Sequence, residues 1–151
     1  FVQSGHGFVM GIVALLAFVP LAAWRLGTRV AVWAFLLGDW VTTVVVLGTA
    51  RLAAAAGSST AGHVLAHLDS GASVACYACA GAFVWSLPRG RLRTLGAVAL
   101  VGDLAVEGVV THMLAEVQHP IGALVGVVVA ATLHADAARG SSRTRVEHAG
   151  A

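Results

Sequence analysis

Two residues that could act together in hydrolysis, a serine and a histidine, each lie near the start of an apolar run. Ser73 lies in DSGASVACYACAGAFVW, and His119 begins HPIGALVG. A serine hydroxyl is a weak nucleophile until a base within hydrogen-bond reach takes its proton, and histidine is well suited to that role near neutral pH. Ser73 and His119 are therefore candidates for a minimal catalytic pair.

The composition indicates what kind of scaffold must position such a pair. Hydrophobic residues make up 58% of the 151 residues and charged residues 11%, with a mean hydropathy of +0.87, whereas about a quarter of the residues in soluble domains are charged. We expect a membrane protein in contact with the lipid bilayer, and the pI near 9.0 gives no reason to infer a nucleic acid partner. All nine basic residues are arginine, and alanine, valine and glycine are abundant, which suggests a GC-rich bacterial genome. We therefore expect the membrane to be a bacterial cytoplasmic (inner) membrane.

Five apolar segments are candidate spans, because about 20 apolar residues in a helix cross a hydrocarbon core about 30 Å thick. They cover residues 7–24, 30–50, 71–87, 95–113 and 120–135, and the third and fifth are short for spans. We expect a short span to begin inside the bilayer, where protein or a water-filled cavity shields its backbone. The predicted fold class is an all-α, polytopic helical bundle over residues 1–138, followed by a disordered cytoplasmic tail over residues 139–151.

The arginines predict the orientation of these segments. They gather in the connection after the first segment, in the connection after the third and in the chain after the fifth, and the positive-inside rule places these connections and the C-terminus in the cytoplasm. The outer ends of the first, third and fifth segments then share one membrane level. His6, Ser73 and His119 lie at these three ends.

Small residues predict which helices touch. Gly122 and Gly126 form a small-xxx-small face, which lets another helix backbone approach closely in lipid. Close packing of residues 71–87 against residues 120–135 would bring Ser73 within reach of His119. Tyr77 follows Ser73 by one turn on the same helix face, so we expect its ring to pack against the imidazole.

These segments together resemble the rhomboid family of intramembrane serine proteases. GASVACYACAGAFVW is similar to the nucleophile segment of that family, and HPIGALVG is similar to the His-x-x-Gly-x-x-x-Gly segment of its last core helix. Residues 6–40 resemble the second and third core helices. The resemblance extends to about Ala138 and matches five of the six core helices, so we expect the first core helix and the loop after it to be missing from this chain.

The resemblance implies a mechanism and a class of substrate. Ser73 would be the nucleophile and His119 the general base and later acid, and the pair would hydrolyse peptide bonds in or near transmembrane helices of membrane-protein substrates. Gly71 would open the nucleophile motif, and Tyr77 would support the imidazole. The backbone N–H of Ser73 and the side chain of His6 would stabilise the oxyanion. The resemblance implies no metal and no cofactor.

Two positions depart from the family pattern. Val74 stands where the family has the glycine after the nucleophile, so a β-branched side chain crowds the site. Met10 stands where the family has an asparagine that donates a hydrogen bond to the oxyanion. Loss of one such donor lowers transition-state stabilisation by about 2.7 to 4 kcal/mol. These departures favour an alternative, a rhomboid-like pseudoprotease that binds membrane-protein helices as clients without cutting them.

Several other polar residues lie within or beside the apolar segments. Acids inside a membrane are rare, so Asp39, Asp103 and Glu107 raise a third hypothesis, a small proton- or ion-coupled transporter. No basic residue lies at their depth, which favours their interpretation as protonated, hydrogen-bonded acids that fasten helices together. His63 and His67 have a spacing that could bind a metal on a helix, but without a clear third ligand we interpret their segment as an amphipathic outer segment.

Overall fold

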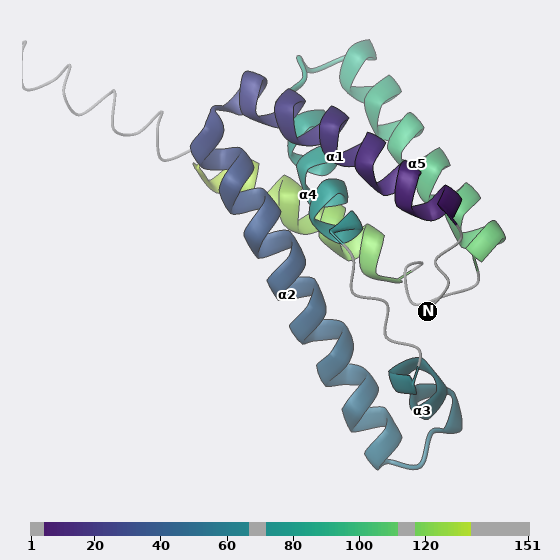
Figure 1. Cartoon of the computed structure of the whole chain (residues 1–151). Helices are drawn as coiled ribbons and strands as arrows, with labels where there is room; N and C mark the ends of the chain where they lie inside the picture. Colours follow the sequence, from purple (N-terminus) through teal and green to yellow (C-terminus); the bar gives the residue numbers. More distant parts are fainter. Residues whose placement is uncertain (1–4, 67–71, 112–116, 134–151) are drawn as a thin grey trace, which may run out of the picture.

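The computed structural model describes residues 5–66, 72–111 and 117–133, and within these ranges every regular element is a helix. The helices are α1 (Gly5–Leu26), α2 (Thr28–Ala55), α3 (Ser59–Ala66), α4 (Ser73–Ser86), α5 (Arg91–Thr111) and the C-terminal helix (Val117–Leu133). Figure 1 shows α4 in the middle of the bundle, with α2 extending beyond the other helices and α3 beside its far end. The predicted all-helical class is confirmed for these residues, and the predicted tail over residues 139–151 lies outside them.

The helices differ in whether they are long enough to cross a bilayer. In the described part of the chain, α2 is the helix that meets the length and hydropathy expected of a span, and Ile12–Leu26, Ser73–Ser86 and Val117–Leu133 are shorter apolar helices. The third predicted segment is indeed short, since α4 has 14 residues. The structure therefore has the helices of a bundle, and the number of membrane spans stays a prediction.

The helix ends differ from the predicted ones by a few residues, and the differences have a physical cause. Helix α2 continues through Arg51 to Ala55, and α5 begins at Arg91 rather than at Leu95. Hydropathy marks only the apolar part of a helix, whereas arginine is a good helix former and extends helices beyond that part. Helices α1 and α4 also start and stop within two residues of the predicted bounds.

The start of the C-terminal helix was predicted wrongly, and the correction bears on the site. The described part of this helix already includes Val117, so His119 lies within the helix instead of before it. Pro120 therefore did not mark the first residue of the helix.

A short helix, α3, follows α2 where a connecting outer segment was predicted. Gly57 ends α2 with a positive φ of 92°, a conformation that glycine adopts without strain. The side-chain oxygen of Ser58 then accepts a hydrogen bond from the backbone N–H of Ala61 at 3.3 Å, which caps the start of α3. His63 lies on this helix, and its side chain and the whole of His67 lie outside the described part. The interpretation of their segment as an amphipathic outer segment rather than a metal site therefore stays a prediction.

Helix α4 is the centre of the packing. It contacts α1, α2 and α5, and the nine residues from Val74 to Ala82 are all buried. Apart from Val74 and Tyr77, these nine residues are alanine, cysteine or glycine. Small side chains let several neighbouring helices approach one central helix at close range. The sequence of α4 therefore suits a helix that is covered on every side.

Candidate functional site

The site is built on close contact between α4 and the C-terminal helix. A Cβ atom at Gly122 would lie 2.8 Å from the carbonyl oxygen of Val74, and a Cβ atom at Gly126 would overlap the carbonyl oxygen of Ala78. The small-xxx-small prediction is thus confirmed. Because residue numbers rise in the same direction along both helices from one contact to the next, the two helices run parallel. Their N-terminal ends therefore lie at the same end of the bundle, as predicted.

Ser73 and His119 meet at these two N-terminal ends. The Nε2 atom of His119 lies 3.1 Å from the Oγ atom of Ser73, so the predicted approach of the two side chains is confirmed. In the tautomer with its proton on Nδ1, Nε2 has the lone pair that can accept the serine proton. His119 is only 5% exposed, whereas Ser73 is half-buried.

The position of Ser73 in its helix adds a second chemical feature. Ser73 is the first residue of α4, and the first backbone hydrogen bond at this end runs from the N–H of Cys76 to the carbonyl of Ala72. The N–H of Ser73 therefore has no partner within the helix, and the positive end of the helix dipole lies beside it. These are the properties that a donor to a developing oxyanion needs.

Tyr77 packs against the imidazole of His119, as the sequence predicted. The ring centroids are 4.3 Å apart with an interplanar angle of 22°, which is a stacked arrangement. Tyr77 is 8% exposed, so its ring fills the space on one side of the histidine. The stack limits how far the imidazole can turn away from Ser73.

The hydroxyl of Tyr77 continues the site onto a third helix. It donates a hydrogen bond to Oδ2 of Asp103 on α5, with the two oxygens 2.5 Å apart. Sequence reasoning predicted that Asp103 fastens helices by hydrogen bonding, and the structure confirms such a bond, but its partner was missed. A signal was present, because a buried phenol needs a hydrogen-bond partner and an acid within an apolar helix needs a donor.

Val74, expected to crowd the nucleophile, has a packing role in the structure. Its side chain is 5% exposed, and its Cγ1 atom lies 2.9 Å from the point where a Cβ atom of Gly122 would be. The valine side chain thus fills the space that the glycine leaves on the C-terminal helix. A residue larger than glycine at position 74 therefore contributes to the interface that brings Ser73 and His119 together.

Other predicted site residues fall wholly or partly outside the described part of the chain. Gly71 lies outside it, and so do the side chains of His6, Met10 and Glu107, although the backbones of these three belong to α1 and α5. The second half of the predicted oxyanion site therefore stays a prediction. Within the described ranges, no group of three His, Cys, Asp or Glu residues is placed to hold a metal ion.

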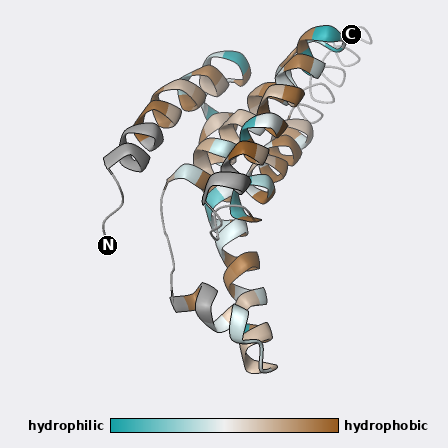
Figure 2. Cartoon of the chain, turned by 90° about the vertical axis from the view of Figure 1, so that its right-hand side faces the viewer, coloured by the Kyte–Doolittle hydropathy of each residue, from teal (hydrophilic) through white to brown (hydrophobic). Residues whose placement is uncertain are grey.

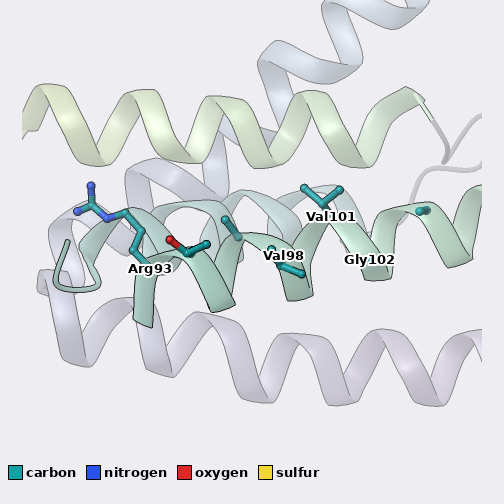
Figure 3. Close-up of a pocket in the computed structure, with 7 residues that line it drawn as sticks. Arg93, Val98, Val101 and Gly102 are labelled. Atoms are coloured by element: carbon teal, nitrogen blue, oxygen red, sulfur yellow. The ribbon is translucent and has the colours of Figure 1, made fainter. Parts of the chain in front are cut away.

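A shallow groove of about 620 Å³ lies along α5, away from the serine and histidine (Figure 3). Its lining is mainly aliphatic and consists of Arg93, Thr94, Ala97, Val98, Val101, Gly102 and Ala105. The guanidinium of Arg93 at one end donates to the carbonyl oxygens of Leu87, at 3.1 Å, and Trp85, and it lies 4.6 Å from the centre of the Trp85 ring. Arg93 thus joins α5 to the end of α4, and the one hydroxyl among these lining residues, that of Thr94, donates to the carbonyl oxygen of Gly90 at 3.2 Å.

Comparison of the chain with family models, with curated proteins and with solved structures gave no match. The functional assignment therefore rests on the residues themselves: a serine, a histidine in contact with it, and the aromatic and acidic side chains behind them.

Proposed function

We propose that this chain is a membrane-embedded serine endopeptidase that hydrolyses peptide bonds in or near transmembrane helices of other proteins. Ser73 is the nucleophile and His119 the general base. The observation that carries the proposal is the 3.1 Å separation of Ser73 Oγ and His119 Nε2, which lies within the range of about 2.6 to 3.2 Å for an activated nucleophile and its base. The class of substrate comes from the resemblance of the two motifs to the rhomboid family.

The reaction follows from the positions of these two side chains. His119 takes the proton of Ser73 while Oγ attacks the carbonyl carbon, and the imidazolium then gives that proton to the leaving amine. An ester on Ser73 remains, and water hydrolyses it with His119 again acting as base. The N–H of Ser73 stabilises the oxyanion in both steps, with the His6 side chain as the proposed second donor. No metal or cofactor takes part in this scheme.

Exposed apolar side chains support a location in the bilayer. Trp40 is 73% exposed, Val44 69% and Leu16 66%, and further exposed leucine and valine residues lie on α5 and the C-terminal helix. Figure 2 shows that hydrophobic residues predominate along the helices. An apolar surface of this extent is unusual in water and suits contact with lipid. We place the chain in a bacterial cytoplasmic membrane, with the arginine-rich ends and the C-terminus in the cytoplasm and the site toward the outer face.

Labelling with a fluorophosphonate probe tests the proposed dyad. The purified full-length protein in detergent should be labelled, and Ser73→Ala and His119→Ala should each abolish labelling. Ser86→Ala is the matched control, because Ser86 lies on the same helix but donates to the carbonyl of Phe83 at 2.6 Å, so this variant should label like the wild type. Labelling that survives Ser73→Ala would contradict the assignment. Cleavage of a transmembrane substrate in proteoliposomes would then establish the endopeptidase activity.

A second candidate is a protein that binds transmembrane helices as clients and does not cut them. Val74 and Met10 favour it, because each replaces a residue that the rhomboid pattern uses near the nucleophile. Absence of labelling in a folded wild-type protein would support this candidate. Val74→Gly combined with Met10→Asn should then introduce labelling if those two departures are the reason for inactivity.

A further inference from the structure

We propose that Asp103 is a positioning residue for the dyad and acts on His119 through Tyr77. This inference rests on the proposed function, because it assigns a role in the activation of Ser73. The contacts form one continuous series across three helices. Ser73 Oγ lies 3.1 Å from His119 Nε2, the imidazole stacks on the ring of Tyr77 at 4.3 Å, and the Tyr77 hydroxyl donates to Asp103 Oδ2 at 2.5 Å.

Asp103 first acts by fixing the ring of Tyr77. The backbone of α4 holds one end of this side chain, and the hydrogen bond to Asp103 on α5 holds the other. An oxygen separation of 2.5 Å lies at the short end of the range for a hydrogen bond from a hydroxyl to an oxygen acceptor. With both ends held, the ring presents a fixed face to His119. The imidazole then stays where Nε2 can take the proton of Ser73, which is the geometric requirement for a general base.

Asp103 also acts through charge. When His119 accepts the serine proton it becomes a cation, and a cation is attracted to the electron-rich face of an aromatic ring. A phenol whose O–H donates a hydrogen bond to a carboxyl oxygen is richer in electrons than a free phenol, so its face attracts the imidazolium more strongly. The proton of Tyr77 stays on its oxygen throughout, and the proton of Ser73 is the one that moves.

A purely structural tether between α4 and α5 is present elsewhere. Arg93 at the start of α5 bonds to the carbonyl oxygens of Trp85 and Leu87 at the end of α4. Removal of Asp103 therefore leaves α5 attached to α4 at its other end. An effect of Asp103 on Ser73 can thus be separated from loss of the fold.

The rate of fluorophosphonate labelling of the full-length protein tests this role. Asp103→Ala and Tyr77→Phe should each slow labelling about tenfold, because each removes the hydrogen bond that fixes the ring of Tyr77. The double variant should be no slower than either single one. Asp103→Asn keeps an acceptor oxygen and should recover part of the rate. Asp39→Asn, an acid-to-amide change on α2, is the matched control and should label at the wild-type rate.

The outcomes separate this inference from the proposed function. An unlabelled wild-type protein would remove the proposed function, and with it the role assigned to Asp103. A wild-type protein that needs Ser73 and His119 for labelling, together with an Asp103→Ala variant that labels at the full rate, would overturn the inference alone. Additive slowing in the double variant would also overturn it, because independent effects add and effects through one shared hydrogen bond do not.

A spectroscopic measurement tests the same contact without activity. A stacked tyrosine ring shifts the imidazole proton signals of His119, which can be assigned by their loss in His119→Ala. Tyr77→Phe and Asp103→Asn should move these signals in the same direction, and Asp39→Asn should leave them in place. Signals of His119 that do not change in the first two variants would overturn the positioning role, even if labelling slowed. Size-exclusion profiles equal to wild type would show that each variant remains folded.

Discussion

Helix α4 meets the C-terminal helix and α5 in two different ways. Toward the C-terminal helix the contacts are between backbones, because Gly122 and Gly126 lie directly against the carbonyl oxygens of Val74 and Ala78. Toward α5 the contacts described above are made by long side chains, Tyr77 with Asp103 at one end and Arg93 with Trp85 at the other. A Cβ atom at Gly96 of α5 would also meet side chains rather than backbone, at 2.9 Å from Cδ1 of Leu87 and 3.5 Å from Cγ2 of Val84.

The difference between backbone contacts and side-chain contacts matches how exactly each interface must position its residues for the proposed reaction. The distance between a general base and its nucleophile can vary only slightly, because a misplacement of about 1 Å can cost a factor of about 100 in rate. Ser73 and His119 lie across the interface that has no room to shift. The proposed role of Asp103 acts at a distance through a ring, and Asp103 lies across the interface that long side chains maintain. The backbone contacts thus set the positions of Ser73 and His119, and in our proposal the side-chain contacts of α5 adjust them.

The largest effect is expected at the backbone interface. Gly126→Val should lower the free energy of unfolding by about 3 kcal/mol or more, because its side chain would overlap the carbonyl of Ala78. It should also abolish labelling of Ser73. Gly102→Ala is the matched control on α5, where open space surrounds the glycine. It should stabilise the protein by about 0.5 to 1 kcal/mol, since alanine favours helix.

Unfolding in detergent, followed by tryptophan fluorescence during titration with a denaturing detergent, measures both changes. Equal stabilities for Gly126→Val and Gly102→Ala would show that Gly126 does not lie against the carbonyl of Ala78 as described.

An intermediate effect is expected where α2 meets α4. A Cβ atom at Gly38 would overlap the Cβ atom of Ala78, so Gly38→Ala should cost about 2 kcal/mol of unfolding free energy. Because the overlap is between side chains, the second change Ala78→Gly should restore much of the loss. The same unfolding titration on the two single variants and the double variant measures the recovery. A double variant no more stable than Gly38→Ala would refute the assigned contact.

The smallest effect is expected at the side-chain interface. Arg93→Ala removes two hydrogen bonds to carbonyl oxygens and the contact with the Trp85 ring, and it should cost about 1 to 2 kcal/mol. Arg93→Lys keeps a charge above the ring but cannot form both bonds, so its free energy of unfolding should lie between those of the wild type and Arg93→Ala. Thermal unfolding compares the three proteins. A loss as large as that of Gly126→Val would mean that α5 is fixed as firmly as the C-terminal helix.

Part of the site was predictable because it depends on periodicity and small residues. The spacing of Gly122 and Gly126 predicted a close helix contact, and the distribution of arginines predicted that both partner helices begin at the same end. Those two statements together place Ser73 beside His119. The stacking of Tyr77 follows from its position one turn after Ser73. None of this required knowledge of side-chain rotamers.

The other features depend on information that periodicity does not contain. The bond between Tyr77 and Asp103 depends on how α5 lies against α4, and a pattern along one helix does not give that angle. The fit of Val74 to Gly122 depends on the same kind of detail. The helical conformation of residues 117–119 was missed because proline, which is favoured at the first helical position, was taken to mark the first residue of the helix. Hydropathy also gave no indication that α3 is a helix.

The two contacts of Ala78 differ in how they constrain change in the sequence over evolution. Its side chain meets Gly38 and its backbone carbonyl meets Gly126. A larger residue at position 38 is compatible with glycine at position 78, so in a set of related sequences these two positions should vary together. Every residue has a carbonyl, so no substitution at position 78 relieves the contact with position 126. Position 126 should therefore stay glycine whatever position 78 becomes, without covariation to reveal the contact.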